Sequence, residues 1–191
     1  ADRRLRGGIK MHIGNSDVQL ERPEHMAQMR RVFRAANQNH MAIVVHLRAN
    51  IGRGRPYGVA QARAFLELLA EAPDIPVQVA HLASSGPGFD DVPADTVMQE
   101  LAAAVQRGDP RTRNLWFDVT TVANDDPLPP ADAERIVRYI RAVGVDRVLF
   151  GSDAAVSNLP PAQAWAAFRR LRLTEDEFAR IAKNQAPYLL P

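Results

Sequence analysis

The sequence predicts an α/β fold in which parallel strands alternate with helices. Five short apolar runs each end in a polar side chain, and these side chains are spaced by 34, 35, 37 and 35 residues: His12, His46, His81, Asp118 and Asp153. That interval fits one strand followed by one helix. Between the runs, apolar residues recur every three or four positions, which is the period of a helix. Alternating strands and helices produce a parallel sheet with right-handed crossovers.

Composition agrees with one globular domain spanning residues 1–191. Hydrophobic residues make up 46% of the chain and charged residues 24%, which is enough for one sizeable core. The net charge is +2 and the lysines are only Lys10 and Lys183, so no basic stripe predicts a nucleic-acid partner. No apolar run approaches the roughly 18 residues of a membrane span. The absence of cysteine excludes disulfides and thiolate metal sites and is compatible with the cytoplasm.

The first unit is predicted from residues 8–46. A strand over residues 8–13 is followed by a loop, and Pro23 then starts a helix that runs to about Asn39. Its apolar side chains recur at helical spacing: Met26, Met29, Val32, Phe33 and Ala36. Residues 41–46 form the second strand, which ends at His46.

The middle of the chain repeats this pattern. A loop over residues 48–58 leads into a helix from about Val59 to Glu71, and a proline-containing turn precedes the strand over residues 77–81. A helix over residues 94–106 comes next, and Gly108 ends it.

The last two units end in helices. A strand over residues 114–120 precedes a helix over residues 131–143, which Gly144 terminates. A strand over residues 147–153 follows, and two helices close the chain. The second of these opens with Thr174 and Glu177 at the spacing of a capping box.

Five such units make an incomplete barrel. Loops after parallel strands converge on one face, so all five polar strand ends are expected together there. An eight-unit (β/α)8 barrel typically takes about 250 residues. The chain is therefore predicted to be a TIM-barrel type α/β fold that supplies about strands four to eight.

Four motifs, taken in order, resemble the amidohydrolase superfamily of metal-dependent TIM-barrel hydrolases. They are VVHL at residues 44–47, VAHLASSG at 79–86, VLFGSD at 148–153 and the segment 181–186. The branch that resembles the chain most is one that also contains decarboxylases and lactonases. The likeness extends over essentially the whole chain from Gly8 onward.

The resemblance implies roles for three strand ends. In that family a fifth-strand histidine binds metal, a sixth-strand histidine binds a second metal or orients substrate, and an eighth-strand aspartate binds metal and transfers the proton. These roles would fall on His46, His81 and Asp153. The family's first strand also carries a His-x-His pair, and no such pair exists in this sequence.

Other polar residues lie near these strand ends. Lys10 holds the place of a fourth-strand lysine and shares a strand face with His12, so both are candidates for substrate contact. Arg48 lies two residues beyond His46, and its guanidinium suits a substrate carboxylate if the strand continues. Asp118 shares a face with Thr120, where it either serves the site or closes its strand through hydrogen bonds.

The implied activity is hydrolysis by metal-activated water. A divalent ion lowers the pKa of its water from about 16 to near 7. Imidazole and carboxylate ligands suit zinc or manganese. Asp153 would take and return a proton, and His81 would stabilise charge on an oxygen of a small carboxylated amide, ester or lactone. A decarboxylase of the same branch and an inactive scaffold remain alternatives. The open sheet edges predict either a homo-oligomer or a separate N-terminal segment that completes the barrel.

Overall fold

A five-stranded parallel sheet forms the centre of the molecule. The computed structural model describes residues 7–48, 56–86, 89, 91–124 and 126–189. The strands follow one another in the sheet in the same order as in the sequence. They are β1 (Gly8–His12), β2 (Ala42–His46), β3 (Val77–Val79), β4 (Leu115–Asp118) and β5 (Val148–Leu149). The predicted alternation of parallel strands with helices is confirmed.

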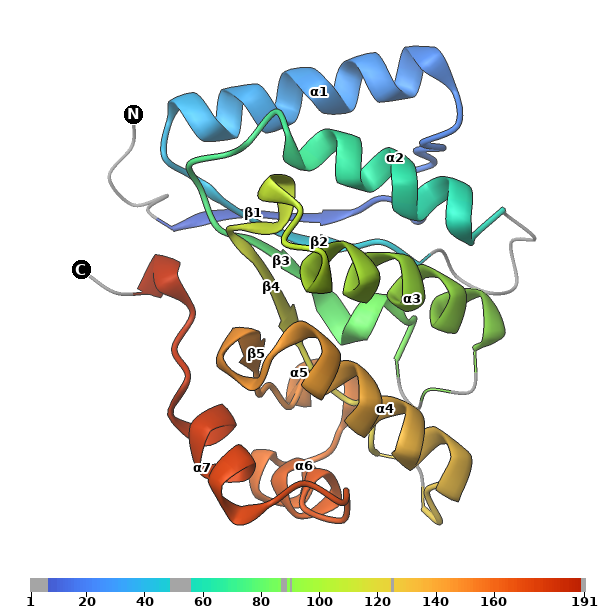
Figure 1. Ribbon diagram of the computed structural model, residues 1–191, viewed down its shortest axis with the longest axis vertical. Helices are drawn as coiled ribbons and strands as arrows, with labels where there is room; N and C mark the ends of the chain where they lie inside the picture. The colour runs from blue at the N-terminus through green and yellow to red at the C-terminus, as the bar shows by residue number, and fades with distance from the viewer. Residues whose placement is uncertain (1–6, 49–55, 87–88, 90, 125, 190–191) are drawn as a thin grey trace.

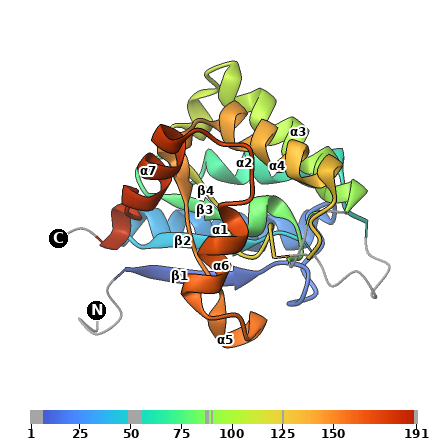
Figure 2. The same cartoon turned by 90° about the horizontal axis from the view of Figure 1, so that it is seen from below.

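One helix follows each of the first four strands, and these helices lie along one face of the sheet (Figures 1 and 2). They are α1 (Pro23–Gln38), α2 (Val59–Leu69), α3 (Val92–Gln106) and α4 (Pro130–Val143). Three further helices follow, α5 (Ala154–Ser157), α6 (Pro161–Phe168) and α7 (Glu175–Lys183), and a 3₁₀ turn over Pro187–Leu189 comes last among the described residues. The capping box at the start of α7 is formed as predicted, by Thr174 and Glu177. No helix in the described part of the chain has the length and apolar character to cross a bilayer.

The helix-covered face of the sheet is the hydrophobic core. Strand side chains alternate between the two faces, and the set under the helices is almost wholly apolar and buried: Ile43, Val45, Val77, Val79, Leu115, Phe117 and Val148. Phe33 of α1 and Phe65 of α2 meet edge to face above it, with ring centroids 6.4 Å apart. Each such side chain contributes about 1.5–3 kcal/mol when fully buried.

The opposite face of the sheet carries the polar groups. Parallel register aligns Lys10 with Val44, Val44 with Gln78, and Gln78 with Trp116 across four strands. One level further along, His12 is paired with His46. Because β1 is an edge strand without a helix over this face, Lys10 and His12 are exposed. The polar strand ends therefore lie on the side of the sheet away from the helical layer.

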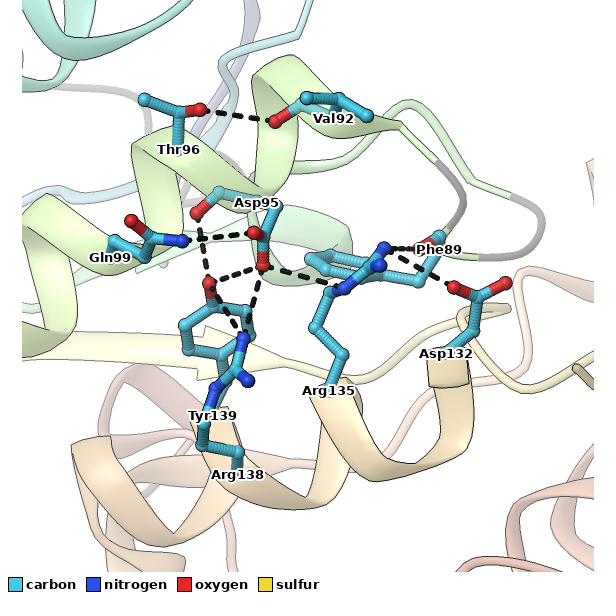
Figure 3. A network of polar contacts seen from close by, with 9 residues as sticks. All are labelled: Phe89, Val92, Asp95, Thr96, Gln99, Asp132, Arg135, Arg138 and Tyr139. Atoms are coloured by element: carbon cyan, nitrogen blue, oxygen red, sulfur yellow. Dashed lines mark hydrogen bonds and ion pairs between the residues drawn. The ribbon is translucent and has the colours of Figure 1, made fainter. Parts of the chain in front are cut away.

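A polar network joins α3 to α4 and anchors the loop that follows β3 (Figure 3). The Tyr139 hydroxyl donates to the Asp95 carboxylate and lies 2.9 Å from the Asp95 carbonyl oxygen. Arg135 pairs with Asp132 at 3.2 Å and donates to the carbonyl oxygen of Phe89 at 3.0 Å. Burial and the Asp95 contact raise the pKa of Tyr139 to about 12, which keeps its hydroxyl a donor. Phe89, which lies between β3 and α3 in the sequence, is thus held to α4.

The predicted strands over residues 77–81, 114–120 and 147–153 end earlier than expected, and β4 stops at Asp118. β3 stops at Val79, and His81 lies in a following 3₁₀ turn, Ala80–Ala83. β5 stops at Leu149, four residues before Asp153. β3 loses its pairing with β4 at His81, because the Asp118 carboxylate accepts the backbone N–H group of His81 as well as that of Thr120. A side chain thus replaces the backbone ladder at this point.

Candidate functional site

Three histidines form a row across the carboxyl ends of β1, β2 and β3. The ring centroids of His12 and His46 are 4.8 Å apart, and those of His46 and His81 are 4.9 Å apart. Register explains the first contact, because the Cα atoms of His12 and His46 are direct partners in the sheet. The second contact depends on the turn that brings His81 back over the end of β3. Residues 34 and 35 positions apart in sequence therefore meet in one place.

His46 lies at the centre of the row and has an unusual environment. Its Nε2 atom is buried and makes no hydrogen bond in the described part of the chain. Burial lowers the pKa of His46 to about 3, and the nearby His81, His12 and Lys10 act in the same direction. The ring is therefore neutral at physiological pH. A neutral imidazole whose buried Nε2 atom has no partner in the described chain has the donor chemistry of a metal ligand.

His81 is held at both its backbone and its ring. Its backbone is left-handed, with φ 54°, and its N–H donates to Asp118 at 2.9 Å. Its Nδ1 atom lies 2.9 Å from the Thr120 carbonyl oxygen. Because a carbonyl oxygen can only accept, Nδ1 carries the proton of the neutral ring. The lone pair is then on Nε2, which is the arrangement that orients a histidine for metal ligation.

Asp118 has a larger part in this geometry than the sequence indicated. Its carboxylate accepts from the backbone N–H groups of His81 and Thr120, at 2.9 and 3.1 Å, and from Gln78 Nε2 at 2.7 Å. Gln78 was not singled out by sequence reasoning, although a polar side chain in the middle of a buried strand is a signal of function or pairing. Asp118 does close its strand through hydrogen bonds, and in doing so it orients His81.

Asp153 and Lys10 lie at the margin of the histidine row. Asp153 precedes α5 in a left-handed conformation, with φ 49°, and its side chain makes no capping hydrogen bond with that helix. Its negative charge raises the pKa of His12, although burial, Lys10 and His81 together lower that pKa more. The negative charge of Asp153 thus acts on His12, and the positive charge of Lys10 acts on both His12 and His46.

Arg48 is buried and has an internal partner. β2 ends at His46, so Arg48 does not continue the strand face of that histidine. Its Nε and Nη2 atoms lie 2.5 and 3.0 Å from the two Asp91 carboxylate oxygens. The guanidinium also lies over the Tyr57 ring, 4.8 Å from its centroid. A substrate carboxylate, the ligand predicted for Arg48 from the sequence, would have to compete with Asp91 for the N–H groups of the guanidinium.

The histidine row does not by itself form a closed metal site. Among the residues that the structure describes, no three imidazole or carboxylate side chains are grouped so that they could hold one ion. The donor types fit zinc or manganese, as the free Nε2 of His46 and the tautomer of His81 indicate. The number of converging donors is smaller than a catalytic site needs.

Gly86 allows the loop after β3 to pack on His81. Its φ is +51°, and a Cβ atom there would lie 2.5 Å from Thr121 Oγ1 and 3.2 Å from His81 Nδ1. We therefore expect Gly86→Ala to displace the His81 ring and to destabilise the protein by about 2–3 kcal/mol, of which about 1–2 kcal/mol is backbone strain. Urea unfolding, together with the NMR shifts of the His81 ring, measures both effects.

Gly108 offers a matched control for this substitution. It is also left-handed, with φ +66°, but a Cβ atom there would meet nothing within 4 Å. Gly108→Ala should cost only the backbone strain and leave the His81 shifts unchanged. Equal losses of stability in the two variants, with unchanged His81 shifts in both, would contradict the close packing at Gly86.

Solved structures with a similar fold include two of an amidohydrolase from Burkholderia multivorans. One has bound zinc and matches with a TM-score of 0.64 and 15% identity over 97% of this chain. The other has bound HEPES and matches with a TM-score of 0.63 and 16% identity over 96% of this chain. An uncharacterised TIM-barrel protein from Bordetella bronchiseptica matches with a TM-score of 0.53 and 16% identity, over 91% of this chain and 50% of its own.

These similarities confirm the predicted barrel-type fold. This chain spans 65% of the length of the two Burkholderia structures. No curated protein matches the sequence. The sequence profile of the family described as amidohydrolase matches residues 1–186. The chain therefore belongs to the amidohydrolase family.

Proposed function

We propose that this chain supplies part of the metal centre of a hydrolase that cleaves an amide, ester or lactone bond in a small carboxylated substrate. The observation that carries the proposal is the Nε2 atom of His46, which is buried, neutral and without a hydrogen-bond partner in the described chain. Such an atom is costly unless something else completes its coordination. A divalent cation would do so.

His46 and His81 would be the imidazole ligands, and Asp153 the carboxylate ligand. When bound, a zinc or manganese ion would supply Lewis-acid activation of water and of the substrate oxygen. Asp153 would accept the proton of the attacking water and return it to the leaving group. The protonated Nδ1 of His81 is committed to Thr120, so the neutral ring offers a lone pair at Nε2. This favours ligation by His81 over hydrogen-bond donation to the substrate.

Substrate contacts would come from the exposed edge of the sheet. Lys10 and His12 are exposed on the same face of β1, beside His46. An ammonium group there suits the carboxylate of a small substrate. Arg48 contributes less to this proposal, because Asp91 already occupies its guanidinium. The absence of cysteine supports action in the cytoplasm.

The remaining ligands would come from outside this chain. The described residues do not converge as three ligands on one ion, and the chain spans 65% of the Burkholderia structures. We propose that an N-terminal segment, or a second copy of the chain, covers the open edge of β1 and completes the site. The isolated 191 residues should then bind metal weakly and show little activity.

Isothermal titration with Zn²⁺ tests this assignment. We expect weak binding by the wild-type chain, no binding by His46→Phe, and wild-type binding by His40→Gln, which changes an exposed histidine after α1. Equal heats from the wild type and His46→Phe would overturn the role of His46. Tight one-to-one binding by the wild type would show that no further ligands are needed.

In a complemented barrel, carbon dioxide release measured against ester or amide cleavage separates a decarboxylase from a hydrolase.

A further inference from the structure

A series of hydrogen bonds, partly buried at Tyr188 and buried from Gln78 onward, connects the C-terminal segment to His81. The Tyr188 hydroxyl donates to Gln78 Oε1 at 2.6 Å, and Gln78 Nε2 donates to Asp118 Oδ2 at 2.7 Å. Asp118 Oδ1 then accepts the His81 N–H at 2.9 Å and the Thr120 N–H at 3.1 Å. Tyr188 and Gln78 are 110 residues apart in sequence. The chain of bonds therefore links the last described turn of the molecule to the candidate site.

Three of the residues joined by these hydrogen bonds are buried, so their polar groups depend on one another for partners. Gln78, His81 and Asp118 are exposed by only 8%, 7% and 5%. A buried carboxylate needs donors, and Asp118 has three, two of them backbone N–H groups. Gln78 can serve Asp118 through its NH₂ group only while its oxygen faces elsewhere. Tyr188 supplies the donor that holds this oxygen, and burial and the Asp118 charge raise the pKa of Tyr188, which keeps its hydroxyl protonated.

The turn that contains His81 needs such support. His81, Leu82 and Ala83 have φ values of 54°, 47° and 61°, a conformation that costs non-glycine residues about 1–2 kcal/mol each. Asp118 accepts the N–H of His81, the first of these three residues, and the Tyr57 hydroxyl donates to the Ala83 carbonyl oxygen at 2.6 Å. The Thr120 carbonyl oxygen accepts from Nδ1 of His81 and so determines which ring nitrogen carries the proton. Asp118 also holds this residue, because its carboxylate accepts the Thr120 N–H.

We propose that Asp118 is the positioning residue of His81, and that Gln78 and Tyr188 fix its carboxylate so that the His81 ring presents Nε2 as a lone-pair donor. Asp118 touches no substrate in this proposal. It acts by fixing both the backbone of His81 and the carbonyl oxygen that selects the tautomer of its ring. This proposal rests on the proposed function only in that the lone pair on Nε2 of His81 would bind the metal ion.

NMR of the metal-free 191-residue chain at neutral pH tests the proposal. In the wild type we expect one His81 tautomer, with the proton on Nδ1, and a slowly exchanging His81 amide. Asp118→Asn replaces one of the two acceptor oxygens with an NH₂ group. In the wild-type arrangement this group would face the NH₂ group of Gln78, so that two donors would oppose each other. We expect a mixture of His81 tautomers and an exchange rate of the His81 amide that rises about tenfold or more.

Tyr188→Phe is the milder variant and decides the test if Asp118→Asn fails to fold. It should shift the His81 tautomer in the same direction by a smaller amount. Tyr139→Phe is the matched control, because it removes a hydroxyl from the α3–α4 network and should leave His81 unchanged. Wild-type tautomer and exchange in both Tyr188→Phe and any folded Asp118→Asn protein would overturn the proposal. Zinc titration is a separate measurement, so a failure of the metal assignment does not affect this result.

Discussion

Replacing His46 with phenylalanine will make the metal-free protein more stable at pH 7, by about 1–2 kcal/mol. The wild-type ring buries an Nε2 atom that no group in the described chain satisfies, and such an atom costs about 1–3 kcal/mol. Phenylalanine has a similar ring and no polar atom, and the flanking rings of His12 and His81 remain in place to pack against it. Urea unfolding in the presence of a chelator measures the gain.

The stability advantage of His46→Phe over the wild type will increase in mild acid. The pKa of His46 is about 3 in the folded protein, against about 6.5 for an unfolded histidine. Between these values the unfolded chain takes up a proton that the folded chain does not, so stability falls as the pH decreases from 6.5 toward 3. The loss is ~1.4 kcal/mol per pH unit, or ~2 kcal/mol at pH 5. His46→Phe removes this loss.

His12→Phe is the control at pH 7. It changes the neighbouring ring in the same row, but His12 is exposed and its substitution should alter stability little. A His46→Phe protein that is less stable than the wild type at both pH values would show that His46 is a packed structural residue whose shape matters. If the variant is more stable and has lost zinc, His46 is a residue retained for function at a cost to the fold.

The arrangement of the sheet was predictable because it depends on local patterns that tertiary packing does not override. Apolar runs of strand length, helical spacing between them and a nearly constant interval require successive parallel strands. The register that aligns His12 with His46 follows from the same interval. The starts of α1 and α2 were located correctly because Pro23 and Gly58 mark them in the sequence.

The ends of the strands were predicted poorly for a physical reason. β3 and β5 were expected to reach His81 and Asp153 but end at Val79 and Leu149, and after β3 the Asp118 side chain takes the backbone N–H group of His81. A carboxylate that caps two segments at once cannot be recognised from periodicity. The ion pair of Arg48 was not predicted either, since its partner Asp91 lies 43 residues away.

The candidate site was therefore predicted in part. The contact between His46 and His81 agrees with the expectation that strand ends converge, whereas Asp153 does not join them as a third ligand of one ion among the described residues. Gln78 and Tyr188 were not predicted, because a hydrogen bond across 110 residues leaves no local pattern. Sequence spacing locates strand ends, while the groups that orient them appear only once the chain has folded.

Removing one partner of the Arg48–Asp91 pair will have the largest effect on stability that we predict. The side chains of Arg48 and Asp91 are only 8% and 6% exposed, and two hydrogen bonds join them. Asp91→Leu leaves a buried guanidinium without its counter-charge, which typically costs about 3–5 kcal/mol. Asp146→Ala, which breaks the exposed Arg180–Asp146 pair, should cost less than about 1 kcal/mol. Urea unfolding of both variants gives the comparison.

The double variant Arg48→Met, Asp91→Leu separates a structural role of Arg48 from a role in substrate binding. If each residue of the pair serves mainly to neutralise the charge of the other, replacing both with apolar residues of similar size should recover most of the stability that Asp91→Leu loses. Arg48 also packs on Tyr57, whose hydroxyl holds the Ala83 carbonyl, so a small part of the loss should persist. A double variant as unstable as Asp91→Leu alone would mean that Arg48 stabilises the fold through Tyr57 rather than through Asp91. A stable double variant that fails in a complemented, active barrel would return Arg48 to the substrate-binding role that its position after β2 suggested.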